Sequence, residues 1–148
     1  MRKFKWRLQR ILELKRKEKN LKKNELLKVT EKLVSKQSEL LVEKLKLKRM
    51  ADEIGKKDAS TRIEEQQLFM KYVHSSNELI SGIKGEIEKL EQIKKEKISK
   101  FQEIQKSKES LEKLREKARE RFLKEQAKQQ QKQIDENFAA IKIKKRVE

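Results

Sequence analysis

Apolar residues recur along most of this chain at intervals of three or four positions, the spacing of one face of an α-helix. Over residues 1–54 the clearest series repeats every seven residues, which is typical of a coiled-coil seam. This series comprises Leu26, Leu33, Leu40, Leu47 and Ile54, with Val29 and Met50 on the alternate seam position, and Leu27, Val34 and Leu41 broadening the stripe. Upstream, the step from Leu21 to Leu26 is five residues, so we expect a local change of register or a bend there.

A second, more regular series runs through the later half of the chain in alternating steps of four and three. Eleven of its sixteen positions are apolar, so the pattern predicts a second long helix that packs against the first. The series comprises Phe69, Val73, Ser76, Ile80, Ile83, Ile87, Leu90, Lys94, Lys97, Phe101, Ile104, Lys108, Leu111, Arg115, Ala118 and Phe122. Gly82 and Gly85 lie inside it, where they favour a bend or a close helix approach.

Between the two series lies the best turn signal in a chain without proline. Gly55 opens it, and Thr61 and Glu64 have the spacing of a capping box at a helix start. We therefore predict a first helix over residues 1–54, a turn over 55–61, a second helix over 62–136 and a basic C-terminal tail over 137–148, in a single elongated domain. Antiparallel pairing about this turn would place Met1 opposite Arg115.

Composition supports an elongated helical structure. Charged residues make up 45% of the chain and hydrophobic residues 34%, which is too little apolar material for a three-dimensional core but enough for a narrow seam. The predicted fold class is all-α, a long two-helix antiparallel coiled-coil hairpin. Full disorder is the alternative that this composition leaves open.

The formal net charge is +17, enough to attract an extended polyanion or an acidic protein surface. Nucleic-acid binding is one hypothesis for the use of this charge, because neutralisation of phosphates by basic residues releases counterions and so favours binding. Acidic residues interleave with the basic ones, however, and seven scattered aromatic residues form no stacking platform. We expect nucleic-acid binding to be incidental, and keep a polyanion binder or a generic self-associating coiled coil as alternatives.

The sequence contains no recognisable catalytic set. His74 is the only histidine, cysteine is absent and no glycine-rich phosphate loop occurs, so no nucleophile–base pair or metal-ligand cluster can be assembled. We predict a protein without enzymatic activity, cofactor, metal or small-molecule substrate. No apolar run approaches the length of a membrane span or a signal-peptide core, so we expect a cytoplasmic protein.

Two apolar groups have alternative interpretations. Phe69, Met70, Tyr72 and Val73 lie just beyond the turn, where little partner helix remains, and so are candidates for a docking site; Phe69 and Val73 are equally consistent with ordinary seam positions. The opening residues 4–12 combine aromatic, leucine and basic side chains that suit an anionic membrane surface, although a continuation of the seam is the simpler interpretation.

The opening KFKWRLQRILELKRKEK (residues 3–19) resembles the start of the FliJ family of flagellar type III export proteins, in which an aromatic-x-aromatic-Arg-Leu motif precedes an apolar and basic helix. The chain length, the two-helix pattern and the ending QIDENFAAIKIKKR (residues 133–146) are similar to that family as well. The resemblance implies a coiled coil similar to the central stalk of a rotary ATPase.

The resemblance also implies partners and sites. It implies roles in flagellum biogenesis, motility and chemotaxis, at the cytoplasmic face of the inner membrane. The implied partners are the hexameric export ATPase, the membrane export gate protein and export chaperones, bound by a monomeric chain. By position, the residues implied to contact the ATPase ring are Phe4, Trp6, Arg7, Leu8, Ile134 and Phe138. Those implied to contact the gate are Phe69, Val73, Met70 and Tyr72.

Overall fold

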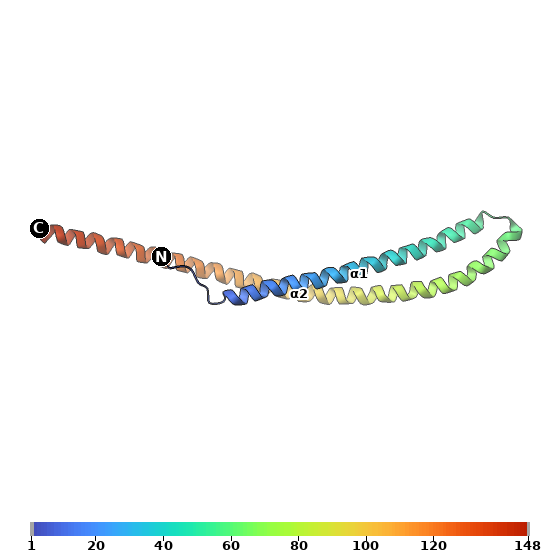
Figure 1. Cartoon of the computed structure of the whole chain (residues 1–148), viewed down its shortest axis with the longest axis horizontal. Helices are drawn as coiled ribbons and strands as arrows, with labels where there is room; N and C mark the ends of the chain where they lie inside the picture. Colours follow the sequence, from blue (N-terminus) through green and yellow to red (C-terminus); the bar gives the residue numbers. More distant parts are fainter. Residues whose placement is uncertain (1, 148) are drawn as a thin grey trace. The chain divides into compact units, whose positions relative to one another are not determined.

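The structure is a computed structural model that describes residues 2–147. Two helices make up nearly all of this part of the chain, α1 (Gln9–Gly55) and α2 (Ala59–Val147), and it contains no strand. They run in opposite directions from a short turn and pack against each other (Figure 1). The predicted all-α helical hairpin is confirmed.

The contacts between the helices fall into two units. Unit 2 is Asn20–Gln102 and contains the turn with the adjoining halves of both helices. Unit 1 combines the described residues before Asn20 with those after Gln102. The single elongated domain stays a prediction, and each unit is described by itself below.

The seam of α2 follows the predicted series throughout. All sixteen positions from Phe69 to Phe122 are buried or partly buried. Ser76, Ile80 and Ile83 are the most deeply buried side chains of this helix. Alternating steps of four and three keep every one of these residues on the side that faces α1, because 3.5 residues per turn is the coiled-coil period.

The seam of α1 differs from the prediction near Leu21. Leu21 is exposed, and burial continues from Leu26 in steps of four and three through Lys22 to Leu12, which is fully buried. The predicted change of register is therefore wrong. A lysine can hold the seam position because its aliphatic stem covers apolar surface while its ammonium group reaches a carboxylate, here Glu25 at 3.4 Å from Lys22 Nζ.

Three residues predicted to broaden the α1 seam lie outside it. Leu27, Val34 and Leu41 are exposed, because each lies one position after a seam residue and hence about 100° around the helix from it. The alternate seam positions between Val29 and Met50 are filled by polar residues instead, namely a partly buried Lys36 and a buried Glu43.

The helix ends also differ from the predicted bounds. α1 begins at Gln9 rather than Met1, which lies outside the described residues. α2 begins at Ala59, so Thr61 belongs to its first turn and is not a cap. The N–H of Arg62 donates to the carbonyl of Asp58 at 2.8 Å, and aspartate is a preferred residue at that N-cap position.

At its other end α2 remains helical through Val147, so the predicted tail over residues 137–148 is helical as far as the structure describes it. Lys144, Lys145 and Arg146 lie in the last turn of α2. Positive charge there is favourable because the unpaired carbonyls at a helix C-terminus carry partial negative charge.

Two further predictions concern the pairing of the helices. A Cβ atom built at Gly82 or Gly85 would meet nothing within 4 Å, so neither glycine lies at a close helix approach, and the bend that they also favour stays a prediction. Arg115 donates from Nε to Oε1 of Gln9 at 2.9 Å, so Gln9 lies opposite Arg115; Met1, the residue predicted at that place, lies outside the described residues. Before Gln9, residues 2–6 have no regular secondary structure and residues 7–8 form a turn. The carbonyl of Arg2 meets Gln126, eleven residues beyond Arg115 on α2.

Candidate functional site

A groove lies beside the turn in unit 2, where the last turns of α1 meet the first turns of α2. It encloses about 430 Å³. We call it the tip groove; its lining residues are Met50, Glu53, Ile54, Lys57, Glu65, Leu68, Phe69 and Tyr72. Its lining combines apolar and aromatic side chains with three charged ones, a composition that suits a site for an apolar side chain of a partner.

The four tip residues predicted from the sequence divide between the seam and the surface. Phe69, Tyr72 and Val73 are partly buried against α1, whereas Met70 is exposed and points away from the seam. Two more apolar residues, Ile63 and Leu68, are exposed on the same first turns of α2. The tip therefore offers both a groove and a free apolar surface.

The turn itself is held by two backbone hydrogen bonds and by one side chain from α2. Lys56 and Lys57 donate their N–H groups to the carbonyls of Glu53 and Ile54, each at 3.2 Å, which tightens the last turn of α1. The guanidinium of Arg62 donates to the carbonyl of Gly55 at 3.0 Å and so satisfies a carbonyl that the helix end leaves unpaired.

A buried polar layer lies next to the tip groove. Glu43 is 9% exposed, and its Oε1 accepts hydrogen bonds from Ser76 Oγ at 2.8 Å and from Tyr72 Oη at 3.2 Å. Burial, together with the hydrogen bond to the Glu43 carboxylate, raises the pKa of the Tyr72 phenol above its usual range. These two hydrogen bonds join α1 to α2, and a shift of one helix along the other would break them, so they help to set the register of the helix pair.

Two ion pairs join the helices further along unit 2. Lys97 Nζ lies 3.0 Å from Glu25 Oε2, and this hydrogen bond is the main reason why the pKa of Glu25 is lowered. Lys36 Nζ lies 2.8 Å from Glu86 Oε2, a bond that raises the pKa of Lys36. Polar residues in the seams thus meet partners of opposite charge across the helix pair.

In unit 1 the extended residues before α1 lie along α2. The ring of Phe4 packs on Phe122 with centroids 5.5 Å apart, and the guanidinium of Arg115 lies 5.7 Å from the Phe4 centroid. The Nε2 group of Gln126 donates to the carbonyl of Arg2 at 3.0 Å. A groove of about 410 Å³ beside this contact is lined mainly by four glutamines of α2, namely Gln126, Gln129, Gln130 and Gln133.

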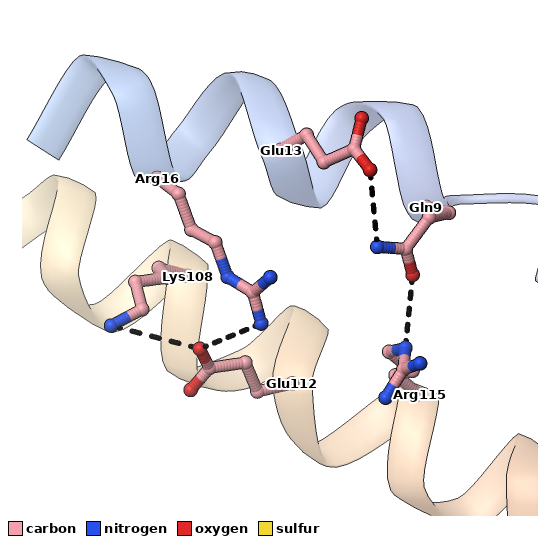
Figure 2. A network of polar contacts seen from close by, with 6 residues as sticks. All are labelled: Gln9, Glu13, Arg16, Lys108, Glu112 and Arg115. Carbon is pink, nitrogen blue, oxygen red and sulfur yellow. Dashed lines mark hydrogen bonds and ion pairs between the residues drawn. The ribbon is translucent and has the colours of Figure 1, made fainter.

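A polar network continues from this contact onto the start of α1 (Figure 2). The side chain of Gln9 bridges the helices, since it accepts from Arg115 and donates to Glu13 at 3.4 Å. One turn along α2 from Arg115, Glu112 forms an ion pair with Arg16 of α1, with 3.5 Å between the Arg16 guanidinium nitrogen and Glu112 Oε1. These contacts tie the extended N-terminal residues and the first turns of α1 to one stretch of α2.

The six residues implied to contact the ATPase ring do not form one cluster. Four of them belong to the N-terminal segment, in which Phe4 contacts Phe122. Within this segment Phe4, Trp6 and Leu8 are partly buried and Arg7 is exposed. Ile134 lies twelve residues beyond Phe122, or ~18 Å along the helix. Ile134 and Phe138 are exposed, with no part of α1 covering them among the described residues.

Sequence reasoning missed the polar layer and the aromatic contact. Glu43 could have been found, because it falls on the alternate seam position between Val29 and Met50 and has a polar counterpart at Ser76. The pairing of Phe4 with Phe122 has no sequence signal, because it depends on residues before Gln9 leaving the helix.

Within residues 2–147, no group of three His, Asp or Glu side chains is placed to hold a metal ion. None of the helical segments described is long and apolar enough to cross a bilayer.

The chain matches a known protein family over nearly its whole length. A family model described as "Flagellar FliJ protein" matches residues 4–148. Comparisons with curated proteins and with solved structures return no match.

Proposed function

The chain belongs to the FliJ family of flagellar proteins and is a component of the flagellar export apparatus, and from this premise we propose that it is a non-enzymatic stalk that couples the export ATPase ring to the membrane export gate. The observation that supports this role most directly is the continuity of α2. One helix carries an apolar group beside the turn, in unit 2, and a second apolar group near its C-terminus, in unit 1.

We assign the tip to the export gate. Met70 is exposed, and Phe69 and Tyr72 line the tip groove. Val73 is partly buried in the seam one turn beyond Phe69. An apolar segment of the gate protein could bury Met70 and insert a side chain between Phe69 and the end of α1 without unfolding the hairpin, as in other helix-in-groove and groove-filling contacts.

We assign the other end to the ATPase ring. Ile134 and Phe138 are seam-like in spacing but lie beyond the part of α2 that α1 covers. The last turn adds three basic residues, and the extended N-terminal residues add Trp6 and Arg7. Cationic groups around exposed apolar ones favour an acidic binding surface, and they accelerate docking in a salt-dependent way.

The remaining parts of the proposal concern partners and location. Export chaperones are further partners, to which we assign no surface. A monomeric hairpin, peripheral at the cytoplasmic face of the inner membrane, can reach both the ring and the gate. Light scattering tests the monomer, because a hairpin that folds on itself predicts a mass close to 17.8 kDa, whereas arms that pair between chains predict at least twice that mass.

The experiment that tests the proposed function measures ATP hydrolysis by the cognate export ATPase with and without the full chain. We expect stimulation that persists at physiological salt, where the Debye length is about 8 Å and long-range attraction is screened. Stimulation that is absent, or that is reproduced by an unrelated basic coiled coil of similar charge, would refute the ATPase part of the proposal.

A further inference from the structure

The exposed face of α1 in unit 2 carries apolar residues that the hairpin does not use. Leu27, Val34 and Leu41 are 51%, 55% and 59% exposed, and Leu45 is 42% exposed. The first three repeat every seven residues, and Leu45 follows Leu41 by one turn. We call these four residues the outer stripe. Heptad spacing places them on one side of the helix, as in the seam of a coiled coil.

Basic residues flank the outer stripe without partners. Five exposed cations lie beside or in line with it and form no ion pair or hydrogen bond in the described part of the chain; they are Lys23, Lys28, Lys44, Lys48 and Arg49. Glu31 is the one acidic residue on that face between Lys23 and Arg49. Lys44 and Lys48 are also four residues apart, a spacing at which like charges on a helix repel.

We infer that the outer stripe is a docking surface for an acidic amphipathic helix of a partner protein, which packs along α1 as a third helix. The apolar residues of that helix would fill the spaces between Leu27, Val34, Leu41 and Leu45, as knobs of a coiled coil do. Its carboxylates would pair with the five free cations and remove their mutual repulsion. This surface is distinct from the tip groove and from the C-terminal end of α2.

Charge argues against a second copy of this chain as the occupant. If two copies paired antiparallel through this stripe, Lys23 and Lys28 of each would oppose the cations around Lys48 of the other, and like charges across an interface are unfavourable. An anionic membrane surface would satisfy the charges too. The heptad spacing of a narrow stripe fits a helix better than a flat lipid surface.

The test titrates the full chain with a fluorescently labelled peptide of about three heptads, the length of the outer stripe, with Leu and Ile at the seam positions and Glu at the flanking ones. A peptide of the same composition in scrambled order, which lacks an apolar stripe, measures attraction by charge alone. Vesicles of phosphatidylcholine with phosphatidylserine measure attraction to an anionic membrane. Circular dichroism verifies that each variant keeps its helix content.

Val34→Gln with Leu41→Gln should weaken binding of the amphipathic peptide by about tenfold or more, because both side chains lie at the centre of the contact. The matched control, Leu114→Gln with Leu123→Gln, replaces two leucines in unit 1 of similar exposure and should leave the affinity unchanged. Lys44→Glu with Lys48→Glu should weaken binding and reduce its salt dependence.

Three results would overturn the inference. The first is no binding of the amphipathic peptide in the micromolar range at physiological salt. The second is equal binding of the scrambled peptide, which would reduce the effect to net charge. The third is loss of vesicle binding, with unchanged peptide binding, in the Val34 and Leu41 variant, which would identify the face as a membrane contact.

Discussion

Removing the Ser76–Glu43 pair of the buried polar layer in unit 2 one side at a time should cost more than removing both sides together. Ser76 is 3% exposed and donates to Glu43 at 2.8 Å. Ser76→Ala deletes a hydrogen bond to a charged acceptor and should lower the free energy of unfolding by about 1.5–3 kcal/mol. Glu43→Leu leaves the Ser76 hydroxyl buried without its acceptor, which costs about 1–3 kcal/mol and is partly offset by the newly buried leucine.

The double variant replaces both members of the Ser76–Glu43 pair with apolar groups, so its cost should be small apart from the hydrogen bond that Tyr72 Oη loses with Glu43. That loss occurs in Glu43→Leu as well and therefore cancels in the coupling energy. The coupling energy, which is the sum of the two single costs minus the cost of the double variant, should therefore be at least the ~1.5–3 kcal/mol of the Ser76 hydrogen bond. Urea unfolding followed by circular dichroism measures it. Strictly additive effects would show that Ser76 and Glu43 do not depend on each other, and would refute the polar layer.

Three further predictions concern the helix pair. Gly82→Ala and Gly85→Ala should each stabilise the chain by about 0.5–1 kcal/mol, because alanine restricts the unfolded chain and the new methyl group has open space; destabilisation in urea unfolding would show that a glycine is required. Leu33→Ala, at a 6% exposed seam position, should cost about 2–5 kcal/mol in the same assay, and a cost near zero would contradict its burial. The pKa values of Lys36 and Tyr72 are raised from 10.5 and 10.0. Both groups therefore keep their protons to a higher pH in the folded chain than in the unfolded chain. Their contribution to the free energy of unfolding should be fully present below pH 10 and should decline as the pH rises through the folded pKa values. Unfolding curves that are unchanged between pH 9 and 11.5 would contradict this.

The course of α2 could be predicted from its sequence because its seam repeats without interruption. From Phe69 to Phe122 each step of three or four residues lands on a buried or partly buried position, even where the residue is Lys97 or Arg115. Lysine and arginine are tolerated there because α1 supplies Glu25 and Gln9 as partners. A regular period therefore outweighs the polarity of single positions.

The seam of α1 could be predicted only in part because apolarity and burial separate along it. Leu21 and Val34 are apolar and exposed, whereas Lys22 and Glu43 are polar and covered. Glu43 is covered because α2 supplies Tyr72 and Ser76 as donors, whereas Lys22 pairs with Glu25 of its own helix. The sequence of α1 read by itself does not show which donors α2 supplies. The start of α1 was misplaced for a similar reason, since the packing of Phe4 on Phe122 favours an extended N-terminus over another helical turn.

The stalk account is tested most directly by asking whether its two contacts can be lost separately. Two double variants are compared by stimulation of the export ATPase and by binding to the gate protein in the same preparations. Phe69→Ala with Val73→Ala should abolish gate binding and keep ATPase stimulation, and Ile134→Ala with Phe138→Ala should do the reverse, with helix content unchanged in both. If both variants lose both activities, or neither loses either, the chain does not couple two partners through separate parts of α2.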